Sequence, residues 1–170
     1  MSEVFCDWDA NRGNPKGQLV LVLFRFAQWC RNLPHPWWLL TTPYLAFYRI
    51  AVEWVLGIEL RFKTKVGPGL RLYHGMGLVI HENTVVGADC VLRQNTTLGN
   101  KTVAGENAGG CPVIGEGVDI GANSVVLGPI RVGDRAVIGA GSVVVKDVPD
   151  GAVVVGNPAR LIRKAEANRH

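Results

Sequence analysis

Histidine is the side chain best suited to acid–base catalysis near neutral pH, because its unperturbed pKa is about 6.5. The chain has four histidines: His35, His74, His81 and His170. His35 lies between two prolines and His170 is the last residue, so neither is placed for catalysis. A lone histidine is more often structural than catalytic. We expect His74 to be the exception, because Gly75 and Gly77 follow it closely and an otherwise regular six-residue repeat is interrupted there.

The four cysteines are Cys6, Cys30, Cys90 and Cys111, and no two of them form a CxxC pair. This spacing is typical of reduced thiols in a cytoplasmic protein rather than of a disulfide framework. Cys90 fits an inward-facing position of the repeat, and Cys111 has no nearby partner in the sequence. We therefore expect no covalent nucleophile, with an acyl-carrying Cys111 as the alternative.

The composition is that of a globular protein, since 48% of the 170 residues are hydrophobic and 19% are charged. The length suits one domain with a small appendage. Part of the formal net charge of +4 comes from a basic carboxyl-terminal stretch, so this end could contact phosphates, or it could simply be a solvated surface. No aromatic-basic platform accompanies it, and nucleic acid is therefore not an expected partner.

The first 58 residues have a helical pattern. Apolar residues recur at three- and four-residue intervals from Pro15 to Arg31, and prolines end this pattern before Trp37. A second helix is predicted from Trp37 or Thr42 to about Leu56, with Gly57 as its cap. Residues 1–14 are polar and do not resemble a signal peptide, so the predicted location is the cytoplasm.

After the helical region the apolar period changes to six residues. The repeating aliphatic positions are Val66, Leu72, Val86, Leu92, Leu98, Ile114, Ile120, Val126, Val132, Ile138 and Val144. A six-residue unit with one inward aliphatic residue suits one short strand and a turn on one face of a triangular prism. Three units then form one coil, and the coils stack their aliphatic residues into a ladder.

The repeat is interrupted in two places. Residues 100–111 do not fit the spacing and are predicted to leave the prism as a glycine-rich loop, a common location for function on a rigid scaffold. The second interruption lies between Leu72 and Val86, where the frame shifts by two residues and where His74 is located.

The repeat over residues 59–163 resembles that of the hexapeptide-repeat acyltransferases. The resemblance implies an all-β fold, a left-handed parallel β-helix, after a helical region at residues 1–58 and before a basic tail at 164–170. The left-handed turn is itself implied only by the resemblance, because parallel crossovers are usually right-handed. A right-handed β-helix and a sandwich are the alternatives. The resemblance also implies a homotrimer.

The segment from Leu72 to Ile80 resembles the catalytic segment of the serine acetyltransferase branch. This resemblance implies that His74 is the general base, and that Glu59 orients its imidazole in place of the usual aspartate. The short helical region and the loop entered through Leu98-Gly99-Asn100 are most similar to the exopolysaccharide O-acetyltransferases of the colanic-acid type.

The resemblance also implies that acetyl-CoA binds in the groove between neighbouring prisms. Its contacts are expected at Asn100, at the alanines of two Ile-Gly-Ala turns, Ala122 and Ala140, and at Lys146 and Arg160 for the 3′-phosphate. A solvated lysine is the alternative reading of Lys146. No metal is expected, because a zinc site of the γ-carbonic-anhydrase kind needs three converging histidines and this region has only two.

The acceptor is predicted to be a sugar hydroxyl in exopolysaccharide or lipid-linked oligosaccharide synthesis, contacted by Tyr73 and His81. Gly110 and Cys111 stand where serine acetyltransferases carry an Arg-His pair that helps to hold serine, and Tyr73 replaces an aspartate. An amino acid with unpaired charges would bind poorly, whereas tyrosine can stack on a sugar ring. Serine O-acetylation and a non-catalytic scaffold remain the alternatives.

Tryptophans and arginines alternate in the helical region. Trp29, Trp37, Trp38 and Trp54 are interleaved with Arg25, Arg31 and Arg49. They could hold the protein at the inner face of the cytoplasmic membrane. The alternative is that these side chains pack between the helices and the base of the prism.

Overall fold

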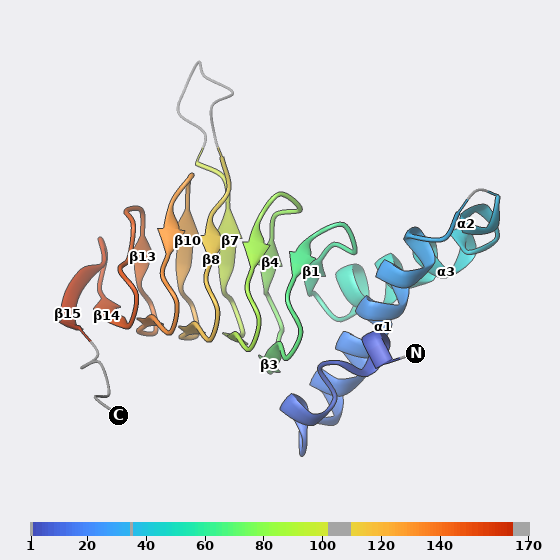
Figure 1. The fold of residues 1–170 in the computed structure, drawn as a ribbon, viewed down its shortest axis with the longest axis horizontal. Coiled ribbons are helices and arrows are strands. Elements are labelled where there is room, and N and C mark those ends of the chain that lie inside the picture. The colour runs from blue at the N-terminus through green and yellow to red at the C-terminus, as the bar shows by residue number, and fades with distance from the viewer. Residues whose placement is uncertain (1, 35, 102–109, 165–170) are drawn as a thin grey trace.

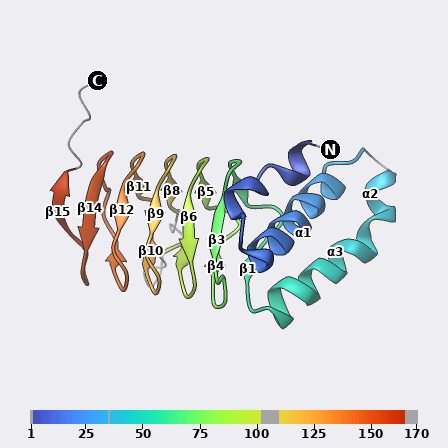
Figure 2. The ribbon, with the colours of Figure 1, turned by 90° about the horizontal axis from the view of Figure 1, so that it is seen from below.

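The computed structural model describes residues 2–34, 36–101 and 110–164. An elongated β-helix carries a group of helices at its amino-terminal end (Figure 1, Figure 2). We call the described residues before Glu59 the cap, and residues 59–164, with the gap at 102–109, the prism. No helix in the described part of the chain is long and apolar enough to cross a membrane.

The cap begins with two short 3-10 helices, Ser2–Phe5 and Asp9–Asn11, followed by α1 (Pro15–Arg31). The side chain of Asn14 accepts a hydrogen bond from the Gly17 N–H and caps α1, as the short polar side chain of asparagine favours. The bounds of α1 confirm the predicted helix. The second helix is not continuous as predicted, because it is divided into α2 (Trp37–Leu40), α3 (Thr42–Tyr48) and a π-helix, η3 (Arg49–Val55).

The prism is built from very short strands. They are β1 (Glu59–Leu60), β2 (Lys65–Val66), β3 (Arg71–Tyr73), β4 (Val79–Ile80), β5 (Val85–Val86), β6 (Val91–Arg93), β7 (Thr97–Gly99), β8 (Val113–Ile114), β9 (Asp119–Ile120), β10 (Val125–Leu127), β11 (Arg131–Val132), β12 (Val137–Ile138), β13 (Val143–Val144), β14 (Ala152–Val155) and β15 (Arg160–Lys164). They form three sheets ordered β1-β4-β7-β10-β13, β2-β5-β8-β11 and β3-β6-β9-β12-β14-β15. We call these faces A, B and C.

Each face stacks strands that are one coil apart, so this is the left-handed parallel β-helix that was predicted. On face A the register pairs Ile80 with Leu98, Leu98 with Val126 and Val126 with Val144. These aliphatic side chains are buried, as are those at the matching positions of the other two faces, apart from the half-buried Val66. Burial of one aliphatic residue per strand, repeated along the axis, stabilises the fold.

The carboxyl-terminal end departs from the repeat. β15 turns back and pairs antiparallel with β14, with Val155 opposite Arg160. Residues Gly156–Ala159 form the turn between these two strands. The antiparallel strand covers the last edge of face C, which would otherwise expose unpaired backbone groups.

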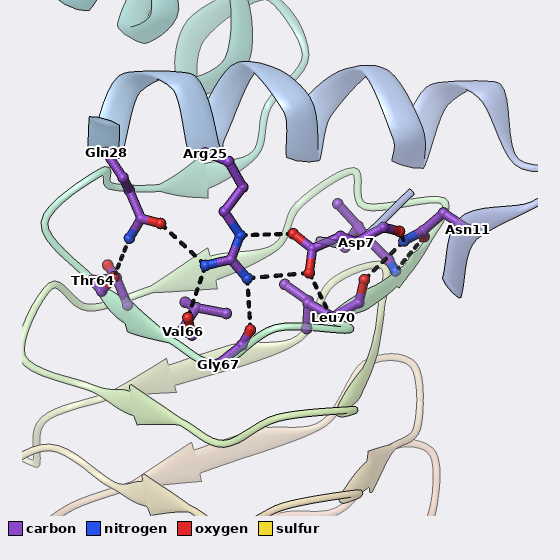
Figure 3. A network of polar contacts seen from close by, with 9 residues as sticks. Asp7, Asn11, Arg25, Gln28, Thr64, Val66, Gly67 and Leu70 are labelled. Atoms are coloured by element: carbon purple, nitrogen blue, oxygen red, sulfur yellow. Dashed lines mark hydrogen bonds and ion pairs between the residues drawn. The ribbon is translucent and has the colours of Figure 1, made fainter. Parts of the chain in front are cut away.

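The other end of the prism is closed by polar side chains of the cap (Figure 3). Arg25 of α1 pairs with Asp7 at 2.7 Å and donates to the carbonyl oxygens of Val66 and Gly67. Asp7 in turn accepts from the Leu70 N–H, and Asn11 bonds both to the Leu70 oxygen and to the Leu72 N–H. Side chains thus satisfy the outer edge of β3, where a preceding strand would otherwise pair.

Candidate active site

The turns that lead from face C to face A form one continuous edge, which we call the site edge. Residues with a positive φ lie in these turns: His74, Asn95, Asn123 and Gly141. Backbone hydrogen bonds join each turn to the next, as from the Asn95 N–H to the Met76 oxygen and from the Gly141 N–H to the Ala122 oxygen. With strands about 4.8 Å apart, the edge from the His74 turn to the Gly141 turn spans about 14 Å.

The His74 turn is two residues longer than the repeat requires, since Leu72 and Ile80 are eight residues apart rather than six. His74, Gly75 and Gly77 all have a left-handed backbone, with φ of 65°, 67° and 68°. A Cβ at Gly77 would lie 2.2 Å from Oδ1 of Asn95, so a larger residue there would have to displace the Asn95 side chain and would also be strained by the positive φ. The glycines let the turn pack tightly, while the imidazole of His74 remains exposed. The positive φ is shared with Asn95 and Asn123 in the equivalent turns, so it belongs to the turn and not to His74 alone.

Glu59 lies in the coil adjacent to the His74 turn. Its N–H donates to the Leu78 oxygen at 2.8 Å, and the Gly77 N–H donates to the Gly57 oxygen at 2.8 Å. The two candidate catalytic side chains therefore belong to stacked segments at the same corner of the prism. Both are exposed, and the structure contains no hydrogen bond between these two described residues.

Tyr73 precedes His74 and lies at the end of β3 on face C, with 39% of its surface exposed. The guanidinium carbon of Arg93 lies 5.7 Å from the centre of the Tyr73 ring, and Arg93 is also paired with Asp119. The hydrogen bond to Asp119 is the main reason that the pKa of Arg93 is raised. Sequence reasoning missed Arg93. The strand register, which places Tyr73 opposite Arg93, would have found it.

His81 is not beside His74, because the two residues lie at opposite ends of β4 and thus at different corners of the prism. Nδ1 of His81 accepts from the Asn83 N–H at 3.2 Å and contacts the Cys111 Sγ at 3.1 Å. The expectation that Cys111 lacks a nearby partner holds only in the sequence, because the base of the loop brings it against His81 in space. Burial raises the pKa of the Cys111 thiol, which favours its neutral form.

The candidate cofactor residues fall into three places. Ala122 and Ala140 lie in successive turns of the site edge, stacked so closely that a Cβ at Gly121 would be 2.4 Å from the Ala140 nitrogen. Lys146 and Arg160 line one surface hollow of about 430 Å³ at the carboxyl-terminal end of the prism. Asn100 is exposed at the corner where β7 ends. The rest of the predicted loop, residues 102–109, lies outside the described residues.

The described residues contain no group of three or more histidine, cysteine, aspartate or glutamate side chains that could hold a metal ion. Within these same ranges, the chemistry-bearing side chains on the site edge are the imidazole of His74 and the carboxylate of Glu59. An exposed imidazole next to a carboxylate-bearing coil can accept a proton from a bound hydroxyl group.

Comparisons with known proteins agree with this fold. The family model for bacterial transferase hexapeptide (six repeats) matches residues 111–146. A protein of Escherichia coli K12 that is named for colanic acid biosynthesis, the acetyltransferase WcaB, is 36% identical over 160 residues. The match covers 91% of this chain and 96% of that protein. A serine acetyltransferase of Synechococcus elongatus is 41% identical over 110 residues, or 64% of this chain and 44% of the relative.

Solved structures give the same result. Soybean serine acetyltransferase without ligand has a TM-score of 0.77 at 31% identity, over 95% of this chain and 68% of that one. A serine acetyltransferase in complex with CoA has a TM-score of 0.74 at 29% identity, over 94% of this chain and 67% of that one.

Proposed function

The chain belongs to the hexapeptide-repeat acetyltransferases, and from this premise we propose that it acetylates a hydroxyl group of a sugar in exopolysaccharide or lipid-linked oligosaccharide synthesis. The observation that carries the proposal is the site edge, which runs from His74 through Ala122 to Ala140. A long, extended acetyl donor can lie along such an edge with its reactive end at the imidazole. The similarity to WcaB over almost the full length of both chains supports the sugar acceptor.

His74 acts as the general base. It removes the proton of the acceptor hydroxyl as the oxygen attacks the thioester carbonyl carbon, and it returns a proton to the sulfur when the carbon–sulfur bond breaks. Glu59 accepts a hydrogen bond from the imidazole in this proposal, which is supported by the stacking of its coil on the His74 turn. Such positioned base catalysis contributes about 10²–10⁴-fold to the rate.

Acetyl-CoA, the acetyl donor, supplies an activated thioester. The backbone groups at Ala122 and Ala140 bind its pantetheine arm along the site edge. Asn100, at the corner where β7 ends, contacts the arm from the neighbouring prism of the trimer, and Lys146 and Arg160 bind the 3′-phosphate. The shared hollow of Lys146 and Arg160 supports the last assignment, because its two cations outnumber its one carboxylate, Asp147, and cations attract a phosphate.

We assign the working assembly as a homotrimer in which each site lies between two prisms. His74 and His81 lie at different corners of a chain. A trimer can bring the His74 corner of one prism near the His81 corner of its neighbour, so that Tyr73 and His81 both contact the acceptor. The catalytic site is then incomplete in a monomer.

Serine is the second candidate acceptor, since the solved relatives named above are serine acetyltransferases. The residues assigned to the acceptor site favour a sugar. Beside His74, Tyr73 offers a partly exposed aromatic ring next to Arg93. At the His81 corner, which the trimer brings to the site from the neighbouring prism, Cys111 is a neutral thiol where a cation would be needed for a carboxylate.

The test is a CoA-release assay with the purified protein and acetyl-CoA, corrected for hydrolysis, with serine and with a panel of oligosaccharides as acceptors. We expect turnover with an oligosaccharide, and a loss of about 10²–10⁴-fold in His74→Ala. Serine turnover that exceeds sugar turnover would overturn the assignment of a sugar as the acceptor. Undiminished activity in a folded His74→Ala protein would overturn the assignment of the base.

A further inference from the structure

The helices from Trp37 to Val55 have apolar residues on two faces. Leu45, Tyr48 and Val52 are buried against α1 and the first coil. The opposite face carries large apolar side chains that are 53–76% exposed: Leu40, Phe47, Ile50, Trp54 and Val55. We call these five residues the outer stripe. A helix that is apolar on all sides is normally buried, so the outer stripe requires a partner.

Within residues 13–58 the exposed charges are basic, and exposed acids such as Glu3 and Glu59 lie outside this range. Between residues 13 and 58 the only acid is Glu53, which is buried and pairs with Arg49 at 3.3 Å. Arg31 is exposed at the end of α1, and the side chain of Arg49 is 50% exposed. Arg25 does not belong to this surface, because its guanidinium is buried against Asp7. The partner should therefore be both apolar and negatively charged.

We infer that the outer stripe binds the surface of a bilayer that contains anionic lipids. Tryptophan and phenylalanine enter the boundary between headgroups and acyl chains, and arginines bind the headgroups. The exposed Trp37 and Trp29 extend the same kind of surface. A second copy of the chain fits less well, because a two-fold contact through this face would bring Arg31 and Arg49 towards the same basic residues of the partner copy.

The cap places this surface next to the candidate active site. η3 ends at Val55, and Gly57 is hydrogen-bonded to Gly77 in the His74 turn. The coil that carries His74 is therefore the one nearest to a bound bilayer. This consequence, access to a lipid-linked acceptor, rests on the proposed function, whereas lipid binding itself does not.

The test is flotation of the full-length protein with vesicles of phosphatidylcholine, with and without phosphatidylglycerol. We expect binding only to the anionic vesicles, and weaker binding at high salt. The double substitution Phe47→Ser with Trp54→Ser should reduce binding by about tenfold or more. Arg31→Glu should reduce it by about fivefold or more. Ile162→Ser, which removes a 64% exposed side chain from β15 at the other end of the prism, should bind as the unchanged protein does.

Size exclusion with light scattering, in the absence of lipid, tests whether a second copy of the chain covers the outer stripe instead of a bilayer. If the double substitution breaks up an assembly of the unchanged protein, a second copy covers the stripe and the inference is wrong. It is also wrong if the unchanged protein does not float with anionic vesicles at low salt, or if both variants bind as Ile162→Ser does. None of these results depends on acetyl transfer, so failure here and failure of the proposed function are distinguishable.

Discussion

The prism and the cap use apolar residues in opposite ways. In the prism most strands bury one aliphatic side chain, and the neighbours of that side chain lie one coil away. In the cap, apolar residues outnumber the positions that the fold can bury, and most of the exposed large apolar side chains of the described chain lie there. In the prism, each coil covers the aliphatic side chains of the next coil. The exposed apolar side chains of the cap have no such neighbouring coil to cover them.

The junction between the two regions shows this difference most clearly. Side chains of Asp7, Asn11 and Arg25 bond to the backbone of the first coil, where the prism has no preceding coil to pair with. The ion pair of Asp7 and Arg25 is buried and supported by several hydrogen bonds. Removal of one partner should therefore be more damaging than any loss of a surface contact.

The largest stability effect is expected for Asp7→Ala. This substitution leaves the buried Arg25 guanidinium without its carboxylate, and we expect a loss of about 3–5 kcal/mol in the free energy of unfolding, measured with urea. The control is Asp9→Ala, which removes a carboxylate that pairs with Arg12 and has an 81% exposed side chain. It should lose less than about 1 kcal/mol. Equal losses would mean that the junction does not hold the first coil.

The second prediction compares the same truncation in both regions. Leu92→Ala removes a fully buried side chain from the ladder and should destabilise the protein by about 2–5 kcal/mol. Leu40→Ala removes a 72% exposed side chain from the cap and should change stability by less than about 0.5 kcal/mol. Urea unfolding of both variants measures the difference. A large loss in Leu40→Ala would show that the outer stripe is covered in solution by another part of the assembly.

The sequence predicts the periodic parts of the molecule well. The six-residue spacing identifies most of the inward positions, although not Leu60, Ile80 and Val154. The excess residues between Leu72 and Val86 and between Leu98 and Ile114 mark both departures from the prism. The position of His74 in an exposed glycine-rich turn follows from the first of these departures. Its role as the base, with Glu59, stays a prediction.

Contacts without a periodic relation could not be predicted. Asp7 bonds to the backbone of a residue 63 positions later, and no spacing rule relates the two. The contact of His81 with Cys111 spans 30 positions and passes through the loop, where the repeat is interrupted. The reversal of β15 involves residues that are close in the sequence. It could not be predicted from the composition of the strand, because it follows from the open edge of β14 at the end of face C.

The third prediction concerns two tyrosines of the cap, of which Tyr48 joins the cap to the prism and Tyr44 donates to the Leu23 oxygen of α1. Tyr48 donates a hydrogen bond to the Leu60 oxygen of β1, and burial raises its pKa well above the usual value. Burial likewise raises the pKa of Tyr44 to about 12. A raised pKa in the folded state means that the stabilisation is complete below the unfolded pKa of about 10 and is lost as the pH rises towards the folded value.

We therefore expect the melting temperature to fall above about pH 10. Tyr48→Phe should lose about 0.5–1.5 kcal/mol at neutral pH, because it removes one hydrogen bond, and it should show a shallower fall at alkaline pH. Thermal unfolding from neutral to alkaline pH measures both effects. The same alkaline slope in Tyr48→Phe would mean that other groups control this transition.

The smallest effect is expected for a substitution of Cys111, which lies at the base of the loop where the six-residue repeat is interrupted and predicts no contacts. Its thiol is neutral at physiological pH because burial raises its pKa above 9.0, and its contact with His81 is one hydrogen bond at a partly exposed site. A neutral thiol is a poor nucleophile, so Cys111→Ser should retain kcat and change KM for the acceptor by less than about tenfold. Alkylation of Cys111 by iodoacetamide should be slow at neutral pH in the folded protein, faster as the pH rises through the raised pKa, and faster at every pH in urea. Mass spectrometry of the protein mixed with acetyl-CoA tests whether Cys111 carries the acetyl group. An acetyl adduct on Cys111 would mean a two-step reaction in place of direct transfer. His74 would then no longer be the sole proton acceptor.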